Sequence, residues 1–130
     1  LYQSIKTGAL GTTNWNHFGG SASVPEQHTM YLSTLVNDVE YPLILKAKHA
    51  GTITSLVEYA ISAGVAGTYT VKVNTTGVTG LEAIANATAL TETNATAANT
   101  FAIGDRVVFI PTGTTAVVGM TVQLSYTRVL

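Results

Sequence analysis

An all-β fold, either a sandwich or a barrel, is predicted by the part of the chain that follows residue 50. Short runs rich in Thr, Val and Ile alternate polar and apolar positions there, as residues 52–61 and 68–73 do. Alternation with a period of two is typical of strands that bury one face. Glycines interrupt these runs at near-regular intervals, and turn signals between many short strands favour a sandwich or a barrel.

The composition limits both the size of the protein and its partners. A chain of 130 residues fits one domain, and the absence of cysteine excludes disulfides and thiolate metal sites. Charged residues make up 10% of the chain and the net charge is −1, so no basic footprint for nucleic acid is present. No run approaches the ~20 apolar residues of a membrane span. We therefore expect neither nucleic acid nor a membrane as partner. Uncharged polar surface is far less costly to desolvate than ions, which favours assembly with other subunits.

Residues 1–29 differ from the remainder and are expected to form an extended N-terminal arm, with residues 30–130 as the β domain. Gly, Ser, Thr and Asn in this arm surround one aromatic cluster, and few consecutive positions alternate. The candidate interface residues that anchor the arm are Trp15, His17 and Phe18. Trp15 either folds back onto its own core or docks on a neighbouring subunit, since tryptophan is enriched at interface centres.

The β domain is expected to begin with two strands. Met30 to Val36 alternates and predicts the first strand, which Asn37-Asp38 ends as a turn. Leu43 to Lys48 predicts the second strand, with Pro42 at its start, where a missing N–H is tolerated. Ala50-Gly51 then turns the chain into the next strand.

Residues 52–62 and 68–74 are expected to pair as a hairpin around a turn at residues 64–67. If facing residues sum to 130, one face becomes wholly apolar, with the pairs Val57–Val73, Tyr59–Val71 and Ile61–Tyr69. The same register pairs Glu58 with Lys72 on the other face. A slip of one residue would oppose a tyrosine to that lysine, so this register is favoured.

The rest of the sequence brings the expected total to about eight strands. Residues 81–90 are ambiguous between a short helix and a strand, and residues 91–100 are expected as an exposed strand or loop. A turn at 102–105 leads into a strand at 106–110. A second turn at 111–115 leads into a long final strand, whose inward-pointing residues are expected to be Met120, Val122, Leu124 and Tyr126.

No catalytic, cofactor-binding or metal-binding constellation is recognised, so we expect a protein that is not an enzyme and uses no cofactor. The histidines lack the H-E-x-x-H spacing of zinc sites, and His49 is expected as an exposed turn residue. Asp38 and Asp105 adjoin turn signals, where a carboxylate accepts backbone N–H bonds. A glycosidase needs two carboxylates across one bond, and the sequence marks out no such pair.

The tyrosines bear on whether the domain could stack against sugars. Tyr59, Tyr69 and Tyr126 fall on faces predicted to point inward, so core packing is their expected role. Tyr31 and Tyr41 are not assigned to the core, so they stay candidates for exposed residues that could stack on a sugar.

A further signal lies in three stretches of the β domain: Ala50-Gly51-Thr52-Ile53-Thr54-Ser55-Leu56, Ala102-Ile103-Gly104-Asp105-Arg106-Val107-Val108-Phe109 and Gly119-Met120-Thr121-Val122-Gln123-Leu124-Ser125-Tyr126-Thr127. Together they resemble the small jelly-roll structural proteins of tailed bacteriophage virions, in which a Gly-Asp hairpin and a long final strand recur. The resemblance covers most of residues 50–130 and none of residues 1–49. It implies an antiparallel jelly-roll β-sandwich, usually trimeric, that serves as capsid decoration, head fibre or fibre tip.

On this resemblance we expect a virion structural protein, located at the virion surface. Its most concrete form is a homotrimeric capsid decoration (cement) protein that stabilises the phage head by binding the major capsid protein or another virion protein. One alternative is the receptor-binding tip of a tail fibre, which would bind a host glycan through loops such as residues 75–80 and 111–116. A second alternative is a carbohydrate-binding module, which would be monomeric and would present an exposed aromatic strip.

Overall fold

The computed structural model describes residues 23–60, 67–115 and 118–130, and within them the chain forms strands and loops but no helix. The ten strands are β1 (Ser23–Thr34), β2 (Tyr41–Ile44), β3 (Gly51–Ala60), β4 (Thr68–Val73), β5 (Thr76–Gly77), β6 (Ile84–Ala85), β7 (Thr91–Asn94), β8 (Thr100–Phe101), β9 (Val107–Thr112) and β10 (Val118–Val129). The predicted all-β class is confirmed. The count of ten strands exceeds the expected eight, and three of the ten, β5, β6 and β8, have two residues each.

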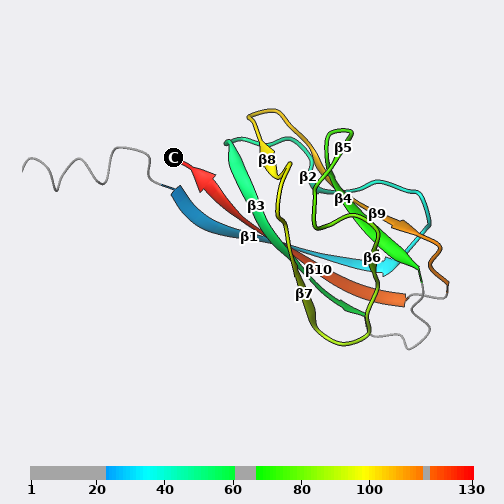
Figure 1. Cartoon of the computed structure of the whole chain (residues 1–130). Helices are drawn as coiled ribbons and strands as arrows, with labels where there is room; N and C mark the ends of the chain where they lie inside the picture. The colour runs from blue at the N-terminus through cyan, green and yellow to red at the C-terminus, as the bar shows by residue number, and fades with distance from the viewer. Residues whose placement is uncertain (1–22, 61–66, 116–117) are drawn as a thin grey trace, which may run out of the picture.

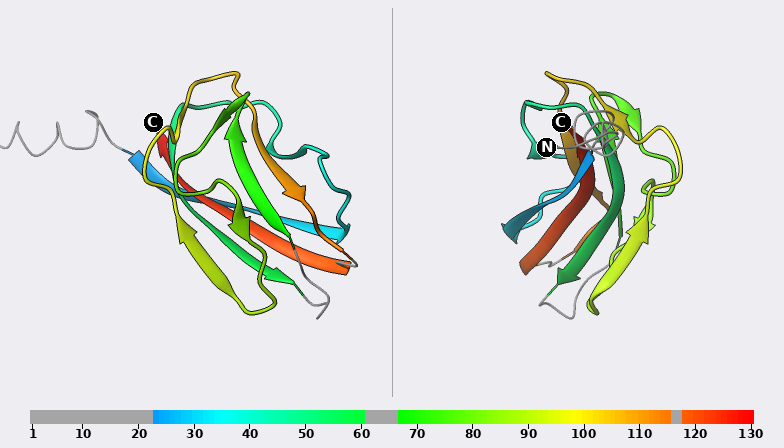
Figure 2. Two further views of the ribbon diagram at one scale, coloured as in Figure 1. Left: turned by 45° about the vertical axis from the view of Figure 1, so that its right-hand side comes forward. Right: turned by 90° about the vertical axis from the view of Figure 1, so that its left-hand side faces the viewer.

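The strands form two antiparallel sheets that pack face to face (Figures 1 and 2). The first sheet has the order β1-β10-β3-β7, with β8 also paired to β3. The second sheet has the order β2-β9-β4-β5, with β6 also paired to β4. Two layers let each sheet bury one face against the other, which is how a β domain of this size acquires a core.

The strand pairs are nested along the chain. β1 pairs with β10, β2 with β9, β3 with β7 and β8, and β4 with β5 and β6. The first four strands also alternate between the first and the second sheet. The described chain is therefore one long antiparallel ribbon that folds across both layers, and its two ends meet where Ser23 faces Val129.

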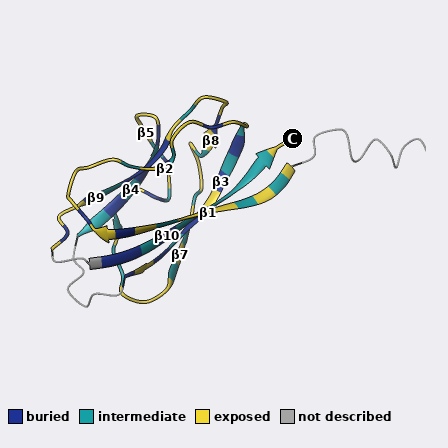
Figure 3. Ribbon diagram, turned by 180° about the vertical axis from the view of Figure 1, so that it is seen from behind, coloured by how far each residue is buried: buried dark blue, intermediate teal, exposed yellow. Residues whose placement is uncertain are grey.

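The core lies between the sheets, as the dark residues of Figure 3 show. Tyr69 and Phe109 are fully buried there, and their rings stack with centroids 5.1 Å apart. The inward side of β10 matches the sequence prediction, because Met120, Val122 and Leu124 are all fully buried. The fourth residue of that row, Tyr126, is half-buried and packs edge-on against Phe101, with ring centroids 5.6 Å apart.

The predicted hairpin is wrong. β3 and β4 belong to different sheets, β3 pairing with β10, β7 and β8, while β4 pairs with β9, β5 and β6. Glu58 therefore does not pair with Lys72; it is buried at 1% exposure on the inner face of the first sheet. Tyr59, predicted to point inward, is 46% exposed.

A β-bulge in β3 explains the wrong prediction for its faces. Opposite β10, Ser125 faces Ser55 but Tyr126 faces Ile53, so Thr54 is an extra residue. Both Ile53 and Leu56 are fully buried although they are three residues apart. A bulge of this kind reverses the inward and outward alternation of all residues that follow it. The hydroxyl of Thr54 donates to the Ser125 carbonyl, 2.9 Å away, and so ties the extra residue to β10.

Three boundaries also differ from the predictions. Residues 23–29, assigned to the arm, lie in β1 and pair with β10. The second strand ends at Ile44, because Ala47 instead exchanges backbone hydrogen bonds with the turn at residues 104–105. Pro111-Thr112, predicted as a turn, closes β9. The ambiguous stretch 81–90 contains the short strand β6.

Replacing Thr54 by Val should destabilise the fold by about 1 kcal/mol, because the substitution removes the hydroxyl that donates to Ser125. Urea unfolding followed by circular dichroism measures the change. Thr52→Val, two residues earlier in β3, is the matched control and should leave the free energy of unfolding nearly unchanged. Equal effects of the two substitutions would contradict the role given to Thr54.

Candidate functional site

The outer face of the first sheet is built from the side chains that β1, β10 and β3 turn away from the second sheet. In register across the three strands lie the rows Tyr31–Thr121–Tyr59, Thr29–Gln123–Val57 and Gln27–Ser125–Ser55. Because facing residues in paired strands project to the same side, each row forms one line across the sheet. The Gln123 side-chain amide donates to the Thr29 hydroxyl at 3.1 Å, which fixes both side chains on this surface.

The outer face is almost free of charge. Among the described residues of its four strands, the register places one charged side chain there, Glu92 of β7, opposite Val57. The Ser55 hydroxyl donates to the Glu92 carboxylate at 2.7 Å, so even this charge is partly satisfied within the chain. The other charged residues of these strands, Glu26, Glu58 and Arg128, lie on the opposite side.

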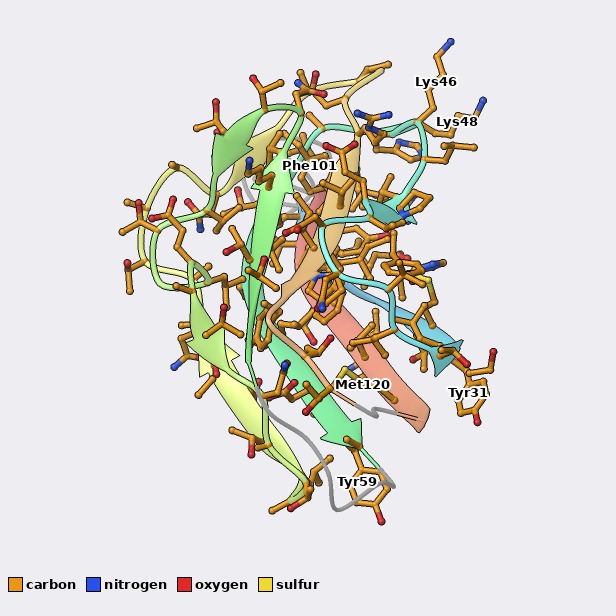
Figure 4. All side chains as sticks on the ribbon, turned by 90° about the vertical axis from the view of Figure 1, so that its right-hand side faces the viewer. Tyr31, Lys46, Lys48, Tyr59, Phe101 and Met120 are labelled. Carbon is orange, nitrogen blue, oxygen red and sulfur yellow. The ribbon has the colours of Figure 1, made fainter. Side chains whose placement is uncertain are left out.

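Two tyrosines stand out from the uncharged outer face. Tyr31 is 59% exposed and Tyr59 46% exposed, and both face Thr121 from opposite sides. Two strand spacings separate them, or about 10 Å. Figure 4 shows both rings projecting clear of the ribbon at the same end of the molecule. Leu90 lies nearby at 74% exposure and helps to line a shallow groove of about 150 Å³.

This composition suits contact with another surface. Thr, Ser, Gln and Tyr side chains can be buried at far lower cost than ions, because desolvating a hydroxyl or amide costs much less than desolvating a charge. Exposed tyrosines add large contact area with few rotatable bonds, and aromatic residues are enriched at interface centres. The arrangement can therefore bind a second protein surface or stack against a sugar ring.

The most perturbed ionisable group of the described chain is the carboxylate of Glu58, inside the sandwich. One of its oxygens, Oε1, accepts a hydrogen bond from the Ala87 N–H at 3.0 Å, and Oε2 is buried without a hydrogen-bond partner. Burial raises the pKa of Glu58 to about 7, and the Ala87 hydrogen bond offsets only part of this rise. Burial likewise raises the pKa of the neighbouring Tyr69 to about 12.

A perturbed carboxylate is a common sign of an active site, but the strand register does not place the carboxylate of Glu92 beside that of Glu58. Glu58 faces Thr91 across the strand pair and Glu92 faces Val57, so the two carboxylates lie on opposite sides of the sheet. They cannot act across one glycosidic bond. Nor do three or more His, Asp or Glu residues gather as a metal site in the described part of the chain.

Of the two aspartates predicted to accept backbone N–H bonds in turns, Asp105 does so, whereas the Asp38 carboxylate accepts from the Thr112 hydroxyl at 3.3 Å. The Asp105 carboxylate accepts from the Ala102 N–H at 2.8 Å and from the Asn74 amide at 3.0 Å, and these bonds lower the pKa of Asp105. His49 is exposed in the loop before β3. Trp15, His17 and Phe18, the predicted arm anchor, lie outside the described residues.

Two features of β3 were not predicted from the sequence: the exposure of Tyr59 and the burial of Glu58. Both follow from the bulge at Thr54. The spacing of the apolar residues Ile53 and Leu56, three apart within one strand run, is the signal that could have located it. An uninterrupted strand would have placed them on opposite faces.

Comparison with known proteins adds no relative. The chain matches no protein-family model and shows no significant sequence similarity to a characterised protein. Within the described residues, no helix is long and apolar enough to cross a membrane.

Replacing Glu58 by Gln should change how stability depends on pH. Burial raises the folded-state pKa of Glu58 from its usual value of 4.5 to about 7. Between these values the folded chain keeps a proton that the unfolded chain has lost, so the stability of the natural protein falls as pH rises. At pH 8 the E58Q variant should be more stable by on the order of 2 kcal/mol, and the difference should shrink towards pH 5. Chemical unfolding across this pH range measures it.

The matched control for this prediction is Glu92→Gln on the exposed outer face. It removes a carboxylate that is exposed at the surface rather than buried, so it should not reproduce the gain in stability of E58Q at pH 8. A pH profile that stays unchanged in E58Q would show that Glu58 does not carry the destabilising ionisation.

Proposed function

We propose that this protein is a non-enzymatic structural protein that assembles with copies of itself through the outer face of the first sheet. Its concrete form in this proposal is a homotrimeric decoration protein on the head of a tailed bacteriophage, located at the virion surface. The observation that carries the proposal is the nearly uncharged outer face, with Tyr31 and Tyr59 exposed on either side of Thr121.

The strand order supports the jelly-roll part of the proposal. A jelly roll is a double-sheet sandwich made by two Greek keys, and it is used by viral capsid and lectin domains. The nested pairs β1–β10, β2–β9 and β3–β8, which alternate between two sheets, have the connectivity expected of such a rolled ribbon. The phage assignment itself rests on the resemblance of residues 50–130, since a fold hosts many functions.

The proposed role is passive. Each subunit would bury its outer face against a sister subunit, while the segment before Ser23, with Trp15, His17 and Phe18, would contact the major capsid protein or another shell protein. Several modest contacts joined in one trimer raise the effective concentration of each remaining contact. The trimer would then cement the shell without any single large interface.

The receptor-binding tip of a tail fibre is the second candidate function. The observation that favours it is again the tyrosine pair, because exposed aromatic rings can stack on a sugar. Tyr31 and Tyr59 border the sheet surface on which the groove next to Leu90 lies. In this case the outer face would contact a host glycan rather than a sister subunit.

Placing a charge in the centre of the outer face should prevent assembly. Thr121→Lys puts one ammonium group between Tyr31 and Tyr59 in every subunit, so the mutual contact would have to desolvate it. We expect the variant to stay folded but to elute as a monomer in size-exclusion chromatography with light scattering. Ile103→Lys is the control, because Ile103 is 72% exposed in the loop before β9 and lies away from this face.

Assembly that persists in T121K, or a natural protein that is monomeric at all concentrations, would contradict the assembly face. A T121K variant that assembles normally but loses binding to a host glycan array would instead favour the fibre tip.

Removing residues 1–22 should leave the fold intact and weaken binding to the particle. The deletion ends before Ser23, because residues 23–25 pair with β10 and belong to the domain. Co-sedimentation with purified shells that lack this protein measures binding, and thermal unfolding measures the fold. Unchanged binding by the shortened chain would overturn the role given to this segment.

A further inference from the structure

A second concave site lies at the end of the sandwich where β1 begins and β10 ends. It is a cleft of about 480 Å³ between the inner side of the first sheet and the segment that leads from β2 to β3. This volume falls within the range of small-molecule sites. Strands β1, β10 and β8 of the first sheet contribute Glu26, His28, Phe101, Tyr126 and Arg128, and the facing wall consists of residues 43–49.

Positive charge is concentrated around this cleft in a chain whose net charge is −1. Three of the five lysines and arginines in the described residues line it, namely Lys46, Lys48 and Arg128. Glu26 is the one acidic residue in the lining, so the fixed charges there sum to +2 (three positive, one negative). Elsewhere in the described chain, Arg106 is paired with Glu40 at 2.9 Å.

Arg128 has donors left over for a ligand. One terminal nitrogen, Nη2, lies 3.3 Å from Oε2 of Glu26, and the other, Nη1, lies 3.3 Å from Nε2 of His49. Strong charge-assisted hydrogen bonds are shorter, about 2.7–2.9 Å. The third nitrogen, Nε, is buried without a hydrogen-bond partner. A guanidinium group of this kind can reorganise to bind a carboxylate or phosphate with two parallel bonds.

The cleft also offers an apolar floor. Phe101 and Tyr126 meet edge to face there, and Leu43 and Ala47 are buried beside them. Gly51 lets Phe101 lie close to β3, because a Cβ at Gly51 would come within 2.5 Å of the Phe101 ring. Figure 4 shows Lys46 and Lys48 projecting from the loop at the rim of this end, away from Tyr31 and Tyr59.

From these observations we infer that the cleft binds a small anion that carries an apolar ring, with a carboxylate or phosphate as its charged group. Lys46 and Lys48 attract the anion at the rim, and Arg128 binds its oxygens. The ring packs against Phe101 and Tyr126. The inference goes beyond the proposed function and does not depend on it, because the cleft lies on the inner side of the first sheet and the assembly face on its outer side.

The competition between Glu26 and the ligand for Arg128 gives a sharp test. If the anion replaces Glu26 as the partner of Arg128, removing the carboxylate should strengthen binding, whereas removing a cation should weaken it. We therefore expect E26Q to bind about ten-fold more tightly than the natural chain and R128Q about ten-fold more weakly. A loss of affinity is also expected for the double variant K46Q/K48Q, whose substitutions lie in an exposed loop.

The experiment is an NMR titration of the full 15N-labelled chain with phenyl phosphate. Inorganic phosphate and phenol, added separately, test the charged group and the ring alone. Phenyl phosphate should cause saturable shifts in residues 43–49 and 124–128. Inorganic phosphate alone and phenol alone should each bind more weakly. Lys72→Gln, on β4 of the second sheet, is the matched control and should bind like the natural chain.

Three results would overturn the inference: no saturable shift up to about 10 mM phenyl phosphate, equal weakening in K72Q and K46Q/K48Q, or weaker binding by E26Q. If R128Q fails to fold, the loop variants and E26Q still decide the question.

Discussion

The central position of β10 is the constraint on which the other features depend. This strand pairs with β1 along one edge and with β3 along the other, and its residues Met120, Val122 and Leu124 are fully buried between the sheets. Pairing of β1 with β10 joins the first and last described strands and so closes the nested ribbon. A register slip of one residue would exchange the two faces of β10, bringing Thr121 and Gln123 into the core. Burial of unpaired hydroxyl and amide groups makes that slip costly.

The same strand separates two surfaces of different chemistry. On its outward side, Thr121 and Gln123 lie between β1 and β3 in a face with almost no charge. On its inward side, Arg128 extends past the end of the core into the cationic cleft. Strand alternation is enough to achieve this, since neighbouring residues of one strand point in opposite directions. An uncharged surface suits contacts that bury large area, whereas a few concentrated cations suit a small charged ligand. The two proposed activities can therefore coexist without sharing a residue.

The all-β class and the inward row of β10 could be predicted from the sequence, because that strand is long and its alternation is uninterrupted. The pairing of β3 could not. Local pattern cannot distinguish a hairpin within one sheet from a crossing between sheets. The bulge at Thr54 then reversed the faces, so that a glutamate expected at the surface is buried and a tyrosine expected in the core is exposed. The cleft was missed for a different reason: Lys46 and Lys48 are distant in sequence from Arg128, and only the meeting of the loop with the end of β10 brings the three residues together.

Sedimentation equilibrium of the natural chain at low and high salt tests whether the uncharged outer face is an assembly surface. Contacts between uncharged groups are not screened by ions, whereas contacts between exposed charges weaken as the Debye length shrinks. We expect a mass three times that of the chain, with an association constant that does not fall as salt is raised. A monomer at every concentration, or a trimer that dissociates in high salt, would contradict it.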